Sequence, residues 1–352
     1  MALVRTRFDS ADLRWRAALR RNWGGRFRRR DGDLLVPRTQ AYQSPQKTVR
    51  NRAALLGRDP AAGLLIGTAL DALVPDPRRG HPVAVFGSAA GALERRWYAD
   101  SRMRGVVFTA ACAGAAVALG AALPDTTLTT VAATWAVLGG RSLRREAGRV
   151  RQLLDQGDLD AARQQVTHLV GRDPESLDAD GIARATVESV AENTSDAIVA
   201  PLFWGAIAGV PGLLGYRAIN TLDAMVGHRS PRYGNFGWAA ARLDDVVNLV
   251  PARLTAALVA SASGHPGQTL RVAVRDGHRH PSPNAGYAEA AYAGGLGLRL
   301  GGRNVYAGRV EHRPALGDGS PPGSDDIARA TRLCAAVTVA AALTAAAIAR
   351  RC

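Results

Sequence analysis

The sequence predicts an all-α protein, a polytopic membrane bundle of about four to six helical spans with soluble helical loops. Three observations predict this class. Charge-free apolar stretches reach the length of a bilayer, arginine clusters flank them, and the apolar segment 198–226 is interrupted by proline and glycine. Such interruptions are tolerated at membrane depth where the backbone is buried in protein or lines a cavity. Some spans are therefore expected to be broken or re-entrant.

The chain has 352 residues, 47% of them hydrophobic, and a formal net charge of +15. That charge suits nucleic acid or an anionic membrane surface as a partner. A nucleic-acid-binding protein would interleave basic residues with exposed aromatic residues or carry a known module, and neither is present. Arginine instead gathers at the ends of apolar stretches, which is typical of cytoplasmic ends of membrane helices. We therefore expect membrane lipid as a partner and no nucleic acid.

Two classes of lysine chemistry are excluded because Lys47 is the only lysine in the chain. A Walker A loop requires lysine after glycine, and Lys47 follows Gln46. An enzyme that uses pyridoxal phosphate requires a Schiff-base lysine, and Lys47 lies in a basic leader. The cysteines Cys112, Cys334 and Cys352 are dispersed, so no disulfide framework or metal knuckle is expected.

The first elements are expected as follows. Residues 1–58 lack apolar periodicity and are predicted to form a basic, poorly ordered extension before a single membrane domain, 59–352. Segment 61–74 has about half a spanning length and is interrupted by Asp71, which fits a re-entrant, tilted or buried helix. Segments 105–124 and 127–140 predict a helical hairpin whose outer ends are cytoplasmic. The alternative is a buried hairpin in a soluble protein.

The second half alternates between polar and apolar segments. Residues 141–197 have helical apolar spacing and are predicted to form a soluble helical insertion that carries part of a site. Segments 249–263 and 334–349 are two further candidate spans. The arginine distribution alone does not fix the topology of these spans.

An acidic helix runs directly into an apolar segment in "ATVESVAENTSDAIVAPLFW". Glu188, Glu192 and Ser195 fall on one helical stripe, with Asn193 and Asp196 beside it. Carboxylates on one face can hold Mg²⁺, whose other positions go to water and phosphate oxygens. The alternative is a solvated acidic face, but charge at a membrane boundary is costly unless it functions.

Further polar residues lie downstream and in two loops. Asn220 and Asp223 are three residues apart in an apolar segment, where ionisable residues are functional candidates. A mixed set with helical spacing suits phosphate and metal binding: Arg242, Asp244, Asp245 and Asn248. The loop motifs "DPRRGHPV" and "HRHPSPNAG" supply His81, His280, Ser282 and Asn284. Helix ends, salt bridges and loop turns are the structural alternatives for these sets.

Four stretches in this order resemble the CobD/CbiB family of cobalamin-biosynthesis membrane proteins, the adenosylcobinamide-phosphate synthases. They are "DPRRGHPV", "ARATVESVAENTSDAIVAPLFW", "YRAINTLDAMVGHRSPRYGNFGWAAARLDDVVNLVPARLTA" and "HPSPNAGYAEAAYAGGLGLRLGG". The resemblance spans about residue 64 to the C-terminus. It implies an ATP-dependent amide ligation that joins adenosylcobyric acid to aminopropanol or aminopropanol phosphate, giving adenosylcobinamide or its phosphate. It also implies a multi-pass protein of the cell (inner) membrane, with other enzymes of the pathway as further partners.

The roles of individual residues are hypotheses from residue chemistry rather than from the family. ATP and Mg²⁺ are the expected co-substrate and ion. The Mg²⁺-nucleotide is assigned to Glu188, Glu192 and Asp196, supported by Asn193 and Ser195. Substrate and phosphate contacts are assigned to Asn220, Asp223, Arg242, Asp244, Asp245, Asn248, His81, His280, Ser282 and Asn284. The competing class is a membrane protein that binds or transports corrinoids without catalysis. A threonine-phosphate decarboxylase that shares the family's name requires pyridoxal phosphate and is excluded by the lysine argument.

Overall fold

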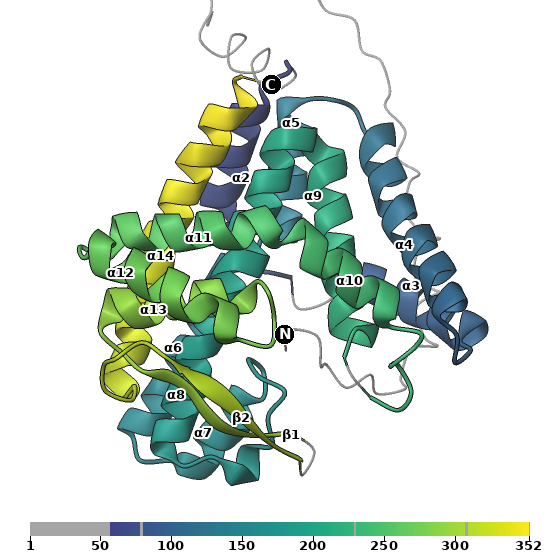
Figure 1. Cartoon of the computed structure of the whole chain (residues 1–352). Helices are drawn as coiled ribbons and strands as arrows, with labels where there is room; N and C mark the ends of the chain where they lie inside the picture. Colours follow the sequence, from purple (N-terminus) through teal and green to yellow (C-terminus); the bar gives the residue numbers. More distant parts are fainter. Residues whose placement is uncertain (1–56, 78–79, 229, 307–308, 352) are drawn as a thin grey trace, which may run out of the picture.

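The computed structural model describes residues 57–77, 80–228, 230–306 and 309–351, and these are mainly helical (Figure 1). The first helices are α2 (Pro60–Leu73), α3 (Pro82–Trp97), α4 (Arg102–Ala122), α5 (Thr127–Val137), α6 (Gly140–Asp155) and α7 (Leu159–Val166). A 3-10 turn (Pro174–Ser176), α8 (Ala179–Thr194), a π-helical turn (Ser195–Val199), α9 (Ala200–Val226), α10 (Trp238–Val247) and α11 (Leu249–Ala262) follow. The last elements are α12 (Pro266–Asp276), a 3-10 turn (Gly277–Arg279), α13 (Ala285–Leu296), β1 (Leu300–Tyr306), β2 (Arg309–Leu316) and α14 (Ser324–Ala349). The predicted helical class is confirmed; the extension predicted for residues 1–58 lies almost wholly outside the described residues.

Three helical segments of the described chain are long and apolar enough to cross a membrane: Arg102–Ala122, Ala179–Val226 and Ser324–Ala349. The pair α10 and α11, bent by 45°, adds a fourth if it counts as one span. This number reaches only the lower end of the predicted range. The short apolar helix α2 is the one that Asp71 interrupts in the sequence.

The predicted hairpin of 105–124 and 127–140 is wrong. Helix α5 has 11 residues, about 16 Å of helix, whereas the hydrocarbon core of a bilayer is about 30 Å thick. Helix α4 packs against α9 and α10, whereas α5 packs against α2 and α9. In Figure 1 the short connection between them, residues 123–126, runs across the top of the view, and the two helices lie apart. The apolar composition of α5 therefore reflects burial inside the protein.

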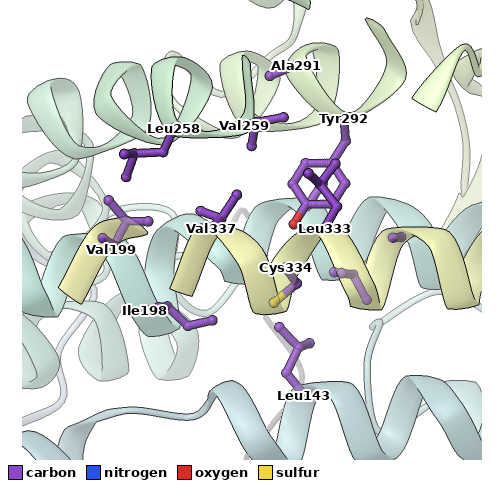
Figure 2. Packing of buried hydrophobic residues seen from close by; sticks show 14 of the residues in the cluster. Leu143, Ile198, Val199, Leu258, Val259, Ala291, Tyr292, Leu333, Cys334 and Val337 are labelled. Carbon is purple, nitrogen blue, oxygen red and sulfur yellow. The ribbon is translucent and has the colours of Figure 1, made fainter. Parts of the chain in front are cut away.

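Helix α14 lies at the centre of the main hydrophobic core. It packs against α2, α6, α8, α9 and α11. Figure 2 shows Leu143 and Ile198 on one side of α14, with Leu258 and Tyr292 on the other. The hydroxyl of Tyr292 hydrogen-bonds the hydroxyl of Thr194 at 2.8 Å. This packing fixes α8 and α13, which carry site residues, against α11 and α14.

Helices α8 and α9 form one continuous helical path through the π-helical turn. The predicted break in the apolar segment is confirmed further along, where Gly209 has φ 60° and ψ −145°. Pro211 follows, and its missing N–H cannot continue the helical ladder. The polar segment 179–194 and the apolar segment after it are therefore directly joined.

A two-stranded antiparallel sheet, β1 and β2, was not predicted from the sequence. Its register pairs Leu300 with Leu316 and Asn304 with Glu311. Arg184 on α8 holds it, donating to the carbonyl oxygens of Gly301 at 2.6 Å and Arg303 at 2.8 Å. The segment mixes glycine and charged residues without clear alternation, so no strand signal was visible. Contacts with α13, which directly precedes it, and with α8, which is distant in sequence, fix its position.

Candidate functional site

The site is organised around the π-helical turn that joins α8 and α9. A π turn inserts an extra residue and is frequent at functional sites. Glu188 and Glu192 lie on α8 before the turn, and Asp196 lies inside it. Asp178 begins the helix by accepting from the Gly181 N–H at 2.8 Å. One helical path thus presents three acids, one turn apart, to the helices that pack around it.

At the first end of the site, Glu188 is buried and fully engaged. One of its carboxylate oxygens pairs with the guanidinium of Arg172, whose side chain is equally buried. The other accepts from the backbone N–H of Gly301 at 2.7 Å. Glu188 therefore links α8 to the loop before it and to strand β1. These contacts give it a positioning role that the spacing of the acids did not suggest.

A histidine and a second glutamate lie beside this pair. His280 Nδ1 accepts from the Ser282 N–H at 3.0 Å, and the other ring nitrogen, Nε2, faces two charged side chains. That nitrogen lies 3.8 Å from Glu289 Oε1 and 3.1 Å from a guanidinium nitrogen of Arg313. Burial and the guanidinium of Arg313 lower the pKa of His280. Burial and the nearby Glu188 raise the pKa of Glu289 well above its usual value.

At the second end, an asparagine joins two carboxylates. The side-chain amide of Asn220 donates to Asp196 Oδ2 at 3.5 Å and to Asp244 Oδ1 at 3.4 Å. Asn248 donates to Asp244 Oδ2 at 3.1 Å and accepts from the hydroxyl of Tyr216 at 2.9 Å. The helices α9, α10 and the π turn thus bring together two acids that are far apart in sequence. Between the two ends lies Glu192, which feels the charges of Arg313 and His280.

The remaining predicted residues divide between this site and its surroundings. Asp223 is within electrostatic reach of Asp196 and Asp245. Arg242 forms an ion pair with Asp245 at 3.3 Å, but its side chain is 63% exposed. Asn284 donates to the backbone carbonyl of Asp245 at 2.7 Å and so ties α13 to α10.

Of three further predicted residues, two form hydrogen bonds within their own segment and one has no hydrogen-bond partner. The Ser282 hydroxyl accepts from the Asn284 and Ala285 N–H groups, which caps α13. Asn193 donates back to the carbonyl oxygen of Ser189 on its own helix. The hydroxyl of Ser195 is buried and has no hydrogen-bond partner.

His81 lies in a separate polar cluster with residues that the sequence analysis did not assign. Its Nε2 is 3.7 Å from Asp76 Oδ1. Asp71 and Arg217 are the other charged members, and the charges of both acids act on Arg217. A rule already applied to Asp223 would have found Arg217 and Asp71, because both are ionisable residues within apolar helices. No local signal identified Arg172, Glu289 or Arg313, whose roles arise from tertiary contacts.

No group of three or more His, Cys, Asp or Glu side chains in the described ranges is arranged to hold a metal ion by itself. Mg²⁺ does not need such a group, since it commonly binds one or two carboxylates together with waters and substrate phosphates. Asp196 and Asp244, joined by Asn220, offer that kind of oxygen set. The assignment of Mg²⁺ to Glu188, Glu192 and Asp196 stays a prediction.

Comparison with known proteins identifies the family. The chain matches the model of the family described as CobD/Cbib protein over residues 64–334, which include every site residue described above. The chain belongs to the CobD/Cbib family. The resemblance stated from the sequence motifs is confirmed.

Named relatives of the CobD/Cbib family align over most of their length. The cobalamin biosynthesis protein CobD of Mycobacterium tuberculosis is 51% identical over 293 residues, covering 80% of this chain and 94% of that protein. The protein of the same name from Rhodobacter capsulatus is 47% identical over 268 residues, covering 73% and 85%. That of Rhizobium meliloti is 40% identical over 283 residues, covering 72% and 86%. No solved structure matches the chain. Membership in the CobD/Cbib family supports a role in cobalamin biosynthesis.

Proposed function

We propose that this protein catalyses an ATP-dependent amide ligation in cobalamin biosynthesis. The acid substrate is adenosylcobyric acid and the amine is aminopropanol or aminopropanol phosphate. The product is adenosylcobinamide or its phosphate. The observation that carries the proposal is the line of buried acids and cations along α8, the π turn and α9. Buried charge of this kind within apolar helices costs free energy and is typical of functional sites.

The ligation needs an activated carboxylate. The substrate carboxylate attacks the γ-phosphorus of ATP and releases ADP, or attacks the α-phosphorus and releases pyrophosphate. The resulting acyl phosphate or adenylate is then attacked by the amine nitrogen. The new C–N bond forms, phosphate or AMP leaves, and the ammonium form of the amine gives up protons in the process. With an acyl phosphate the products are the amide, ADP, phosphate and one proton.

We assign the Mg²⁺-nucleotide to the Asp196–Asp244 end of the site. Both carboxylates contact the side-chain amide of Asn220, so their oxygens face a common point. Mg²⁺ there would neutralise the phosphates and polarise the attacked phosphorus. Glu188 is assigned a positioning role instead, because Arg172 and the Gly301 N–H already engage its oxygens. Glu192 lies next to both ends and stays a candidate ligand.

The reaction is tested with purified, membrane-reconstituted protein. It is incubated with adenosylcobyric acid, Mg-ATP and either aminopropanol or its phosphate, and the amide is measured by mass. We expect product only when ATP is present. Folded protein that gives no amide but accumulates corrinoid in vesicles would support the transport class instead.

The Mg²⁺ assignment has its own variant. Asp244→Asn keeps the shape of the side chain and removes its charge, so we expect the Mg²⁺ concentration for half-maximal rate to rise at least about tenfold. Asp155→Asn is the matched control, since Asp155 is an exposed residue at the end of α6 whose carboxylate pairs with Arg151. An unchanged Mg²⁺ dependence in Asp244→Asn would remove the ion from this position.

We further propose a multi-pass location in the cell (inner) membrane. The apolar helices α4, α9 and α14 support it, because their lengths and compositions fit a bilayer. The helices α6 and α7 lie outside every candidate span, which supports a soluble insertion within a single domain. Other enzymes of the cobalamin pathway are proposed as partners.

A further inference from the structure

A second group of buried polar side chains lies where α2, α3, α5, α6 and α9 meet. Its members are Asp71 at the end of α2, Asp76 and His81 in the next loop, Trp135 on α5 and Arg217 on α9. The rings of His81 and Trp135 have centroids 6.4 Å apart. The charges of Asp71 and Asp76 both act on Arg217, and that of Arg217 acts on His81. The end of α2 with the loop after it, α5 and α9 therefore contribute to one cluster, although these three parts of the chain are distant in sequence.

Among the described residues, this cluster gathers buried polar atoms that have no hydrogen-bond partner. They are Asp71 Oδ1, His81 Nε2, Trp135 Nε1 and Arg217 Nε. Buried polar atoms are paired in the great majority of protein structures, because an unpaired one loses its water and gains nothing in return. Several in one place indicate a group that binds there and supplies the missing partners.

The chemistry of the unpaired atoms defines that group. Trp135 Nε1 and Arg217 Nε are donors only. His81 Nδ1 accepts from the Val83 N–H at 3.3 Å, so Nε2 of the neutral ring is a donor as well. Burial lowers the pKa of His81, which favours this neutral form. Three donors in one cluster match an acceptor-rich group such as a phosphate or a hydroxyl.

The acidic members of the cluster match a cationic group. One oxygen of Asp71 accepts from the Arg141 N–H at 3.3 Å and caps α6, whereas the other is unpaired. Asp71 is only 2% exposed, and Asp76 adds a second carboxylate nearby. A buried carboxylate with an unpaired oxygen is satisfied by a cation that brings its own donors, such as a primary ammonium. The cluster is thus complementary to a small ligand that carries both an ammonium and an oxygen acceptor.

The position of the cluster connects it to the nucleotide end of the site. Arg217 also donates to Asn220 Oδ1 at 3.4 Å, and Asn220 is the residue that joins Asp196 to Asp244. The side chains of His81 and Asp76 remain 19% and 30% exposed. His81 and Asp76 thus lie at the solvent-accessible edge of the cluster, and Arg217 lies at the edge that adjoins the nucleotide end.

We infer that Asp71, Asp76, His81, Trp135 and Arg217 form the binding subsite for the amine substrate, a short amino alcohol or its phosphate monoester. The inference rests on the proposed ligation. The ammonium lies against Asp71 and Asp76, and the hydroxyl or phosphate oxygens accept from Trp135, His81 and Arg217. The phosphate is then held by donors that approach from three different helices or loops.

The first test is kinetic and uses variants that keep the local fold. Asp71→Asn retains an oxygen to cap α6 but loses the charge, so the KM for the amine is expected to rise roughly tenfold or more. Trp135→Phe retains the ring and loses one donor, so KM for the phosphate ester is expected to rise about two- to tenfold. The rise for the free amino alcohol should be smaller. In both variants KM for ATP stays as in the wild type.

The controls repeat the same chemical changes elsewhere. Asp125→Asn alters an exposed aspartate that pairs with Arg58, and Trp238→Phe alters a tryptophan that is 41% exposed. Neither control should change KM for the amine. The subsite is wrong if the wild type forms the amide and both Asp71→Asn and Trp135→Phe keep the wild-type KM for both amines.

A binding measurement separates this inference from the proposed reaction. Aminopropanol phosphate is titrated calorimetrically into reconstituted wild type and variants, with inorganic phosphate and aminopropanol alone as further ligands. Binding to the wild type that weakens in Asp71→Asn supports the subsite even if no amide is formed. Absence of wild-type binding, or equal binding to Asp71→Asn, overturns it. Stronger binding of the ester than of either fragment is expected, because only the ester engages both halves of the cluster.

Discussion

Glu289 is a buried carboxylic acid that lies beside the charged side chains of α8. It is 1% exposed, its Oε2 has no hydrogen-bond partner, and Glu188 lies close enough for repulsion. Burial and that repulsion raise the pKa of Glu289 in the folded protein. A group with a raised folded pKa contributes stability that is complete below its unfolded pKa and is lost as pH rises through the folded pKa.

The prediction concerns stability as pH increases from about 4.5. Glu289→Gln mimics the protonated side chain and cannot titrate, so its melting temperature should fall less with rising pH than that of the wild type. Scanning calorimetry of the reconstituted protein across this range measures the difference. Glu311→Gln, at an exposed position on β2, is the control and should follow the wild type. Parallel curves for Glu289→Gln and the wild type would contradict the prediction.

At the residue scale, the sequence predicted site residues that stand out among their neighbours along the chain. It did not predict residues whose role depends on partners distant in sequence. Asp196, Asn220 and Asp244 were selected as polar residues within or beside apolar segments, and the structure brings them together. Arg172 and Glu289 were missed because their importance comes from burial and from partners distant in sequence. Spacing along one helix reports which residues share a face, but not what packs against that face.

At the scale of elements, α9 depends on one backbone position. Gly209 has φ 60° and ψ −145°, a region that is essentially restricted to glycine. The turn lets α9 continue in a new direction before Pro211 and carries Tyr216, Arg217 and Asn220 to the site. The strand hairpin was missed and α5 was wrongly predicted to be a membrane span. Apolar composition and glycine content do not reveal which tertiary neighbour covers a segment.

Gly209→Ala is therefore expected to destabilise the fold by about 1–3 kcal/mol, since alanine is strained in this conformation. An added Cβ would have room, since the nearest atom, on Pro211, is 3.9 Å away. The strain arises from the backbone conformation itself and remains. Gly114→Ala is the matched control in α4, where an added Cβ meets nothing within 4 Å. It should be neutral or stabilise the helix by up to about 1 kcal/mol. Denaturant titration of both variants checks the difference, and equal stabilities would refute the strain.

At the scale of the whole molecule, apolar surface and buried charge coexist. Helix α4 exposes Met103, Val107 and Leu119, and only 33% of its most apolar window is buried. Such a surface suits lipid contact. Charged residues instead face the interior between α8, α9 and α10, as expected for ionisable groups in membrane proteins. This arrangement suits the proposed ligation, because the charged groups are kept away from the apolar outer surface.

The central claim is that the protein activates a carboxylate with ATP before the amide forms. It is tested most directly by a single turnover with adenosylcobyric acid whose reacting carboxylate carries ¹⁸O, together with aminopropanol phosphate and Mg-ATP. If the carboxylate is activated first, we expect one labelled oxygen to appear in phosphate, for an acyl phosphate, or in AMP, for an adenylate, as the amide is formed. An amide formed with no ¹⁸O in either phosphorus product would show that ATP does not activate the carboxylate.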